Sequence, residues 1–285
     1  MLKRLRSILP GFGETTTVVP VVRLSGLIGV SAPLRPGLTL ASTAAALNRA
    51  FGVKRAPAVA IVINSPGGSP VQSHLVYKRI RQLSEEKNKT VIAFVEDVAA
   101  SGGYMLALAG DEIFVDPSSI VGSIGVVSQG FGFVRLIDRI GVERRLYTSG
   151  ENKAILDPFR PENPDDVEHL KRLQADVHDH FISLVKARRE GRLADDPTLF
   201  TGLFWSGRQA VDLGLVDGLG DVRGVLVDRY GKDVTLKVVA TSRGSLFRRP
   251  SPEIGGGLAA RIAAGLADGI VDAAEARAMW SRYGL

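Results

Sequence analysis

The sequence contains no cysteine among its 285 residues. This absence excludes disulfide bonds, a thiol nucleophile and any metal site built on thiolate ligands, while leaving the redox compartment open. Aromatic residues make up only 6% of the chain, and no basic segment is interleaved with them. The formal net charge of +6 is therefore the only argument for a nucleic-acid partner, and we expect none.

The chain also lacks a long uninterrupted hydrophobic run. The apolar stretch over 18–30 is broken by Pro20 and Arg23, and the basic start of the chain is followed by an apolar run too short for a signal sequence or a spanning helix. We therefore expect residues 1–16 to form a flexible basic N-terminus and the protein to be cytoplasmic. The basic residues could still contact the inner membrane peripherally.

Short β-branched runs alternate with helical patterns along most of the chain. This rhythm predicts an α/β fold with a mostly parallel sheet and helices on its faces. Strands are expected at 18–24, 58–63, 90–95, 112–115, 142–148 and 234–240, and helices at 38–51, 69–86, 101–109, 133–140, 163–189 and 206–213. Residues 17–242 then form the main domain, 243–257 a linker and 258–285 a C-terminal helix that packs on another subunit.

Two glycine-rich turns directly follow buried strands. At Pro66-Gly67-Gly68 a strand turns into a helix, and adjacent glycines there could leave N–H groups facing a ligand, or could serve only a tight turn. At Ser101-Gly102-Gly103 a serine stands at a similar turn among small residues. Such a serine is either a nucleophile with an exposed hydroxyl or an ordinary helix cap.

A serine nucleophile needs a base to accept its proton. The four histidines are unpromising, because three of them lie in a charged helical segment and His178 and His180 point to different sides of it, which also argues against a metal site. His74 is best interpreted as an ordinary helix residue. A neutral lysine is the other known base for serine, provided that burial removes its proton. Lys153 is a candidate, although composition alone does not distinguish it from the other lysines.

Five segments in order resemble the core motifs of the signal peptide peptidase A family of serine proteases, over about residues 18–240. They are Asn64-Ser-Pro-Gly-Gly68, Ala100-Ser-Gly-Gly-Tyr104, Val121-Gly-Ser-Ile-Gly125, Ser149-Gly-Glu-Asn-Lys-Ala154, and Trp205-Ser-Gly-Arg-Gln-Ala210 with Gly214-Leu-Val-Asp217. The resemblance implies a Clp/crotonase-like spiral ββα fold and makes residues 17–242 a peptidase domain.

The resemblance also implies roles for individual residues. Ser101 would be the nucleophile, Lys153 the general base and Ser123 a hydroxyl that orients the lysine. The N–H groups of Gly67, Gly68 and Gly102 would form the oxyanion hole. No metal or other cofactor is implied. Because family members can share the dyad between subunits or repeats, a chain with a single repeat is expected to form a homo-oligomer.

The expected function is a serine endopeptidase that cleaves extended peptides with small or apolar side chains, such as remnants of signal peptides or other membrane or cytoplasmic peptides. Two alternatives remain at this stage. A crotonase-like acyl-CoA enzyme would share the fold and the oxyanion hole without needing the Ser–Lys pair. A catalytically inactive oligomeric scaffold at the membrane would need neither residue.

Overall fold

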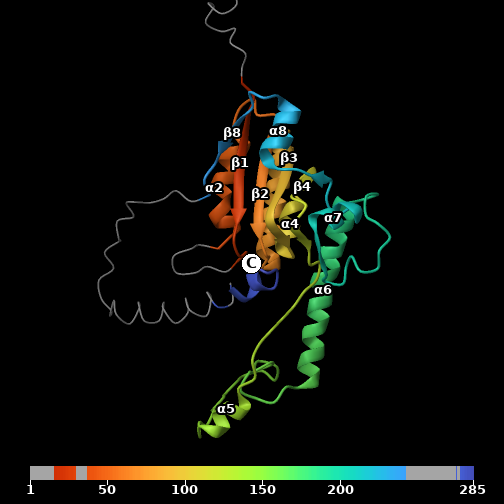
Figure 1. The fold of residues 1–285 in the computed structure, drawn as a ribbon. Helices are drawn as coiled ribbons and strands as arrows, with labels where there is room; N and C mark the ends of the chain where they lie inside the picture. The colour runs from red at the N-terminus through yellow and green to blue at the C-terminus, as the bar shows by residue number, and fades with distance from the viewer. Residues whose placement is uncertain (1–15, 30–36, 242–273, 275–276) are drawn as a thin grey trace, which may run out of the picture.

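The structure, a computed structural model, describes residues 16–29, 37–241, 274 and 277–285 (Figure 1). The predicted linker at 243–257 lies outside the described residues, as do nearly all of the predicted N-terminal segment and most of the predicted C-terminal helix. Among the described residues, no helix combines the length and the apolar character that crossing a membrane requires.

The centre of the molecule is a sheet in which all strand pairs except one are parallel. Its order is β6-β5-β3-β2-β1-β8, and β4 pairs with both β3 and the short β7. The strands are β1 (Val18–Ser25), β2 (Ala58–Ser65), β3 (Thr90–Ala100), β4 (Glu112–Val115), β5 (Ile120–Gly122), β6 (Phe204–Ser206), β7 (Gly218–Leu219) and β8 (Thr235–Val238), and only β5 and β6 are antiparallel. The predicted α/β fold with a mostly parallel sheet is confirmed.

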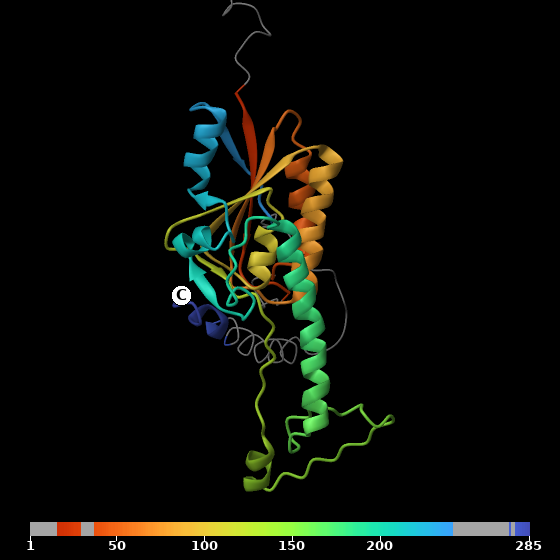
Figure 2. The ribbon, with the colours of Figure 1, turned by 90° about the vertical axis from the view of Figure 1, so that its right-hand side faces the viewer.

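Helices cover both faces of this sheet, which explains why every residue of β2 is buried. The three helices α2 (Leu40–Phe51), α3 (Pro70–Lys87) and α4 (Gly102–Ala107) lie on one face, and α8 (Val222–Tyr230) lies on the other (Figure 2). Leu226 of α8 packs there on Val19, Ala60 and Ile92. The short α7 (Gly207–Asp212) follows β6.

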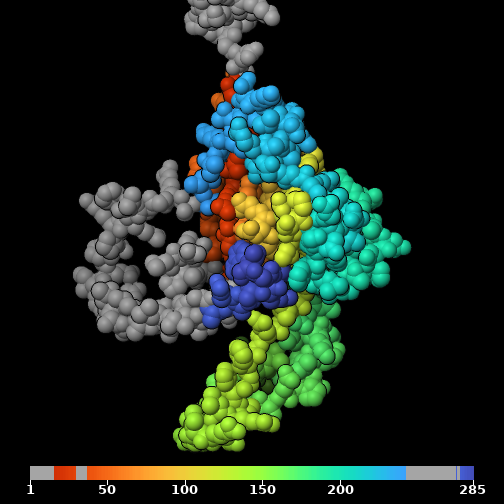
Figure 3. Space-filling view, viewed as in Figure 1, coloured from red at the N-terminus to blue at the C-terminus, as the bar shows by residue number. Residues whose placement is uncertain are grey.

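The long helix α6 (Pro164–Arg188) is packed on the rest of the chain only toward its C-terminal end, where Phe181 and Val185 are buried. Its N-terminal end is preceded by residues 126–163, which we call the extension. The extension contains α5 (Val134–Arg139) and projects beyond the carboxyl ends of β1 and β2 (Figures 1 and 3). Inside it, Arg144 pairs with Asp157 at 2.9 Å and lies over the ring of Phe159.

The predicted strand at 142–148 is wrong. These residues form no strand, and Val142 and Tyr147 remain 52% and 89% exposed. The alternating pattern is typical of a strand, but the extension offers no neighbouring strand with which to pair. Conversely, β3 continues five residues beyond its predicted end at Val95. Its polar residues Glu96 and Asp97 have partners, because Glu96 binds Arg23 at 2.6 Å and Asp97 accepts a hydrogen bond from Asn64 at 2.6 Å.

The same C-terminal part of α6 contacts α3 through a pair of histidines. His180 Nε2 lies 2.8 Å from His74 Nδ1. Burial lowers the pKa of His74, and the neighbouring His180 and Lys78 lower it further. The Tyr77 ring, at 6.0 Å, also faces His74. Since two protonated imidazoles cannot share one hydrogen bond, acid is expected to weaken this contact.

The lowered pKa predicts a pH dependence of folding stability. As the pH falls, His74 binds a proton in the unfolded chain at a higher pH than in the folded chain. The neutral His74 therefore makes its full contribution to the free energy of unfolding above about pH 6.5, and this contribution is lost as the pH falls below that value. Urea unfolding at pH 7.5 and pH 5 should therefore show a larger loss of stability in the wild type than in His74→Gln. His169→Gln, at an exposed position of α6, is the control. Equal losses in wild type and His74→Gln would contradict the prediction.

Candidate active site

Ser101 stands at the sharp turn between the end of β3 and the start of α4. Its backbone has φ 52° and ψ −121°, a conformation that residues with a side chain rarely adopt. Its side chain makes no capping hydrogen bond to the helix, so the interpretation of Ser101 as an ordinary helix cap is wrong. Strain of this kind costs about 1–3 kcal/mol and persists only where the surroundings hold it.

The surroundings hold Ser101 from both sides. On the strand side, its N–H donates to the Gly122 carbonyl of β5 at 2.8 Å. On the helix side, its own carbonyl accepts a hydrogen bond from the Met105 N–H at 3.1 Å, which closes the first turn of α4. The hydroxyl is therefore presented at the end of two paired strands.

Gly67 and Gly68 line the approach to this serine, and neither tolerates a side chain. A Cβ on Gly67 would lie 2.9 Å from the Ser101 Cβ, and one on Gly68 would lie 2.1 Å from the Ile28 carbonyl oxygen. Both have positive φ, at 105° and 139°. Ile28 holds the glycine turn on both sides of Gly68, because its N–H donates to the Gly67 carbonyl and its carbonyl accepts a hydrogen bond from the Ser69 N–H.

Two of the three predicted oxyanion-hole donors are free in the described part of the chain. No acceptor is found there for the N–H groups of Gly68 and Gly102. The Gly67 N–H instead donates to Ser65 Oγ at 3.2 Å. Gly68 and Gly102 are thus the available donors, whereas Gly67 supplies space beside Ser101. The N-terminus of α3, which begins just beyond at Pro70, adds positive potential.

Ser123 lies one peptide away from the carbonyl that holds Ser101. It is buried at 6% exposure with φ 53°, and its N–H donates to the Leu203 carbonyl at 2.7 Å. A Cβ on the preceding Gly122 would lie 2.7 Å from the Trp205 ring. The motif around Trp205 therefore fixes the backbone on which Ser101 and Ser123 both depend.

Lys153 lies apart from these residues. It is exposed in the extension, where its N–H closes a turn onto the Gly150 carbonyl at 3.2 Å. Within the described residues, no contact joins its side chain to Ser101. The single chain therefore brings together Ser101, Ser123 and the three glycines, but not the predicted base.

The histidines are less solvated than the sequence suggests. His178 is partly buried, with Nε2 3.0 Å from the Ile124 carbonyl oxygen, directly after Ser123. Of the four histidines, only His169 is both exposed and without a polar or ring contact to another described residue. In the described parts of the chain, no group of three or more metal-binding side chains comes together.

Sequence reasoning missed a contact between the C-terminal residues and the nucleophile strand. Trp280 and Tyr283 pack on Val98 and Ala100 of β3, directly before Ser101. The Tyr283 ring also meets the ring of Phe204 at 5.1 Å. The only signal in the sequence is a pair of aromatic residues near the end of a long helical pattern. Packing of this helix on another subunit stays a prediction.

A strained serine at the end of a parallel strand, close to N–H groups that have no acceptor among the described residues, is an arrangement typical of serine hydrolases. The model of peptidase family S49 matches residues 84–236. The chain belongs to peptidase family S49. This confirms the predicted family and favours the peptidase class over the acyl-CoA alternative.

Several relatives show how the chain compares with longer proteins. Two Brucella proteins named Na⁺/H⁺ antiporter NhaA are 58% identical to it over its whole length, which corresponds to 39% of theirs. The chain thus spans about two fifths of the length of these relatives. A putative protease of Synechocystis is 37% identical over 59% of this chain and 60% of its own. A probable protease SohB of Haemophilus influenzae is 29% identical over 67% and 53%.

A solved structure of a membrane-bound stomatin-specific protease with a substrate peptide is also similar. It covers 89% of this chain and 99% of its own, with 17% identity and a TM-score of 0.48.

The geometry around Gly68 yields a prediction. Gly68→Ala should lose about 1–3 kcal/mol of stability through backbone strain, and should lose reactivity because Ile28 must shift away from the free N–H. Thermal unfolding and labelling of Ser101 by a fluorophosphonate would measure the two effects. Gly231→Ala is the matched control, since its φ is also positive, at 90°, but a Cβ there meets nothing within 4 Å. Unchanged labelling in Gly68→Ala would remove Gly68 from the site.

Proposed function

We propose that the protein is a serine endopeptidase that uses a Ser101–Lys153 dyad. The observation that carries the proposal is the Ser101 hydroxyl, which is free of any capping bond and stands in a strained turn beside the unpaired N–H groups of Gly68 and Gly102. An inactive scaffold would have no reason to maintain this strain.

The reaction follows from these groups. Ser101 Oγ attacks the peptide carbonyl carbon while neutral Lys153 Nζ takes its proton. The Gly68 and Gly102 N–H groups stabilise the oxyanion. The lysine ammonium then protonates the leaving amine as the C–N bond breaks. Water, which gives a proton to the same lysine, attacks the acyl-enzyme, and the returned proton restores Ser101.

Lys153 must reach Ser101 in a dry environment for this chemistry, because an exposed lysine stays protonated at neutral pH. We propose that a second copy of the chain supplies this environment by packing against the extension. The extension is unusually apolar on its surface, with Phe131, Ile140 and Tyr147 at 81%, 62% and 89% exposure. Such a patch favours a protein contact.

The extension and the start of α6 also line a cavity of about 1000 Å³. Phe131, Phe133 and Leu156 contribute to its walls, so an apolar side chain of the partner could enter it. Ser123, which is buried and one peptide away from the carbonyl that binds the Ser101 N–H, would hold the incoming lysine. The oligomer would then complete both the base and its burial.

We propose extended peptides with small or apolar side chains as substrates, because glycines rather than side chains flank Ser101. Remnants of signal peptides fit this description, and a relative from Enterococcus faecium is named a putative signal peptide peptidase SppA. For the location we propose the cytoplasm, with peripheral contact of the basic N-terminus with the inner membrane.

The dyad is tested by three substitutions. Ser101→Ala should abolish fluorophosphonate labelling and peptide cleavage, and Lys153→Ala should reduce both by 100-fold or more, consistent with loss of a general base at about 10²–10⁴-fold. Lys171→Ala, at an exposed position of α6, is the control. Wild-type activity should rise from neutral to alkaline pH as the base loses its proton. Full activity of either dyad variant, or a flat profile from pH 6 to 10, would refute the assignment.

A further inference from the structure

The Gly214–Asp217 segment is a motif to which the proposed chemistry gives no role. It follows α7, and Leu215 and Val216 are buried at 0% and 3% exposure. The Tyr104 hydroxyl donates a hydrogen bond to the Leu215 carbonyl at 2.8 Å. Tyr104 belongs to α4, three residues after Ser101, and is fully buried. The nucleophile helix is therefore tied to this segment by one hydrogen bond inside the core.

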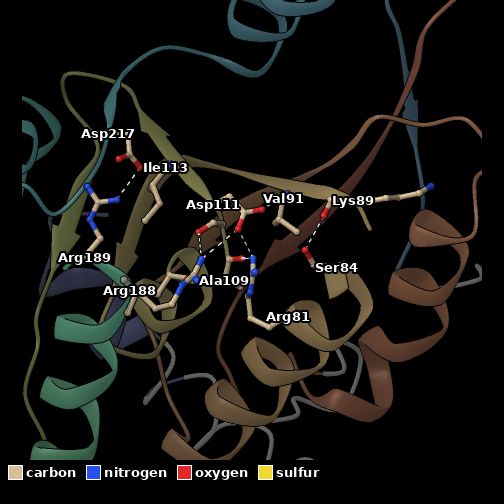
Figure 4. Close-up of polar contacts among 12 residues, drawn as sticks. Arg81, Ser84, Lys89, Val91, Ala109, Asp111, Ile113, Arg188, Arg189 and Asp217 are labelled. Atoms are coloured by element: carbon tan, nitrogen blue, oxygen red, sulfur yellow. Dashed lines mark hydrogen bonds and ion pairs between the residues drawn. The ribbon is translucent and has the colours of Figure 1, made fainter. Parts of the chain in front are cut away.

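The same segment also holds α6. Arg189, which caps α6 and is only 2% exposed, donates from Nε to the Gly214 carbonyl at 2.8 Å. Its second contact is an ion pair with Asp217 at 2.8 Å, shown in Figure 4. Asp217 in turn accepts the Ile113 N–H of β4 at 2.8 Å and pairs with Arg192 at 2.9 Å. Both ends of the motif are thus bonded to the end of α6.

A further contact brings the two helices together directly. Arg188 donates from Nε to the Leu108 carbonyl at 2.9 Å and from its guanidinium to the Gly110 carbonyl at 2.8 Å. Leu108 is the residue that ends α4. The C-terminal ends of α4 and α6 therefore meet, and both helices are bonded to Gly214–Asp217.

We propose that Gly214–Asp217 is a common anchor for the nucleophile helix and for the helix that carries the lysine extension, and that Tyr104 is a positioning residue for Ser101. The inference rests on the proposed function and adds how each chain fixes its own Ser101 relative to the extension that it would offer to the neighbouring copy. Loss of the Tyr104 hydroxyl would leave the Leu215 carbonyl without this partner in the core.

Tyr104 would affect catalysis by keeping the Ser101 turn in its strained conformation. The turn at φ 52° persists only if the segments on both of its sides are fixed. The Gly122 carbonyl fixes the strand side, and the position of α4 fixes the helix side. If α4 moves, Ser101 relaxes, and Oγ and the Gly102 N–H leave their aligned positions. Burial raises the pKa of Tyr104 far above its usual range, so the hydroxyl stays protonated and acts as a donor, not as an acid or base.

Tyr104→Phe tests the proposal, because it removes one hydroxyl and retains the ring. We expect the rate of fluorophosphonate labelling and kcat to fall by about 10- to 100-fold with KM little changed, since small misplacements of reacting groups have effects of this size. Tyr77→Phe is the matched control on neighbouring α3, because the Tyr77 hydroxyl makes no hydrogen bond within the described part of the chain. A loss confined to thermal stability, with kcat and labelling rate unchanged, would overturn the positioning role.

The double variant Tyr104→Phe/Arg189→Lys tests the shared anchor. If both residues act through Gly214–Asp217, the two rate losses should be smaller in combination than their product. Fully multiplicative losses would show that the two arms are independent and would overturn the common anchor.

The outcome also separates this inference from the proposed function. Wild-type labelling at Ser101 together with an unaffected Tyr104→Phe would refute the positioning role alone. Absence of Ser101 labelling in the wild type would refute the protease assignment. In that case, amide hydrogen exchange over residues 102–107 decides the anchor: faster exchange in Tyr104→Phe supports it, and unchanged exchange overturns it.

Discussion

The hydrogen bond between the Ser101 N–H and the Gly122 carbonyl, at 2.8 Å, is the interaction on which the site depends. It joins the ends of β3 and β5 at the point where the chain must enter a strained turn. The residues around this turn help to keep it in its strained conformation. Glycines at 67 and 68 leave room beside the turn, Trp205 packs behind Gly122, and Tyr104 ties the following helix to the core. Packing on both faces of the sheet stabilises the fold enough to offset the free energy of this strain.

The molecule has two parts with different physical character. The sheet and its helices form a well-packed body that presents the strained Ser101 and two N–H groups without an acceptor among the described residues. The extension is exposed and apolar, and it carries Lys153 without a partner in the described chain. Peptide hydrolysis by a Ser–Lys pair requires that these two parts meet in the absence of water. The proposed association of two copies would satisfy that requirement and would also cover the apolar surface of the extension.

Sequence reasoning succeeded where local pattern and packing agree. The strand at 58–63 and the starts of the helices predicted at 69–86 and 163–189 agree with the structure. Burial dictates the strand locally, and the caps Ser69 and Asn163, each followed by a proline, dictate the helix starts. Ser101 and Gly68 were found from motifs, since a strained turn limits which residues can occupy it. The engagement of the Gly67 N–H by Ser65 could not be read from the motif, because it depends on a side-chain rotamer in a neighbouring turn.

Other features depend on distant partners that no local pattern reveals. The strand predicted at 142–148 fails for want of a neighbour, whereas the short β5 and β6 form because each finds one. The packing of Tyr283 behind Ala100 joins residues far apart in sequence. In the proposed mechanism, the position of Lys153 relative to Ser101 would belong to the same class, because an assembly and not one chain would decide it.

Mixing two inactive variants tests this central claim most directly. Ser101→Ala retains the lysine and Lys153→Ala retains the serine, so a shared site predicts that each is inactive alone and that an equal mixture, allowed to exchange subunits, cleaves peptides. If the mixture stays inactive although native mass measurement shows mixed oligomers, the two residues do not meet across a subunit interface and the account is contradicted.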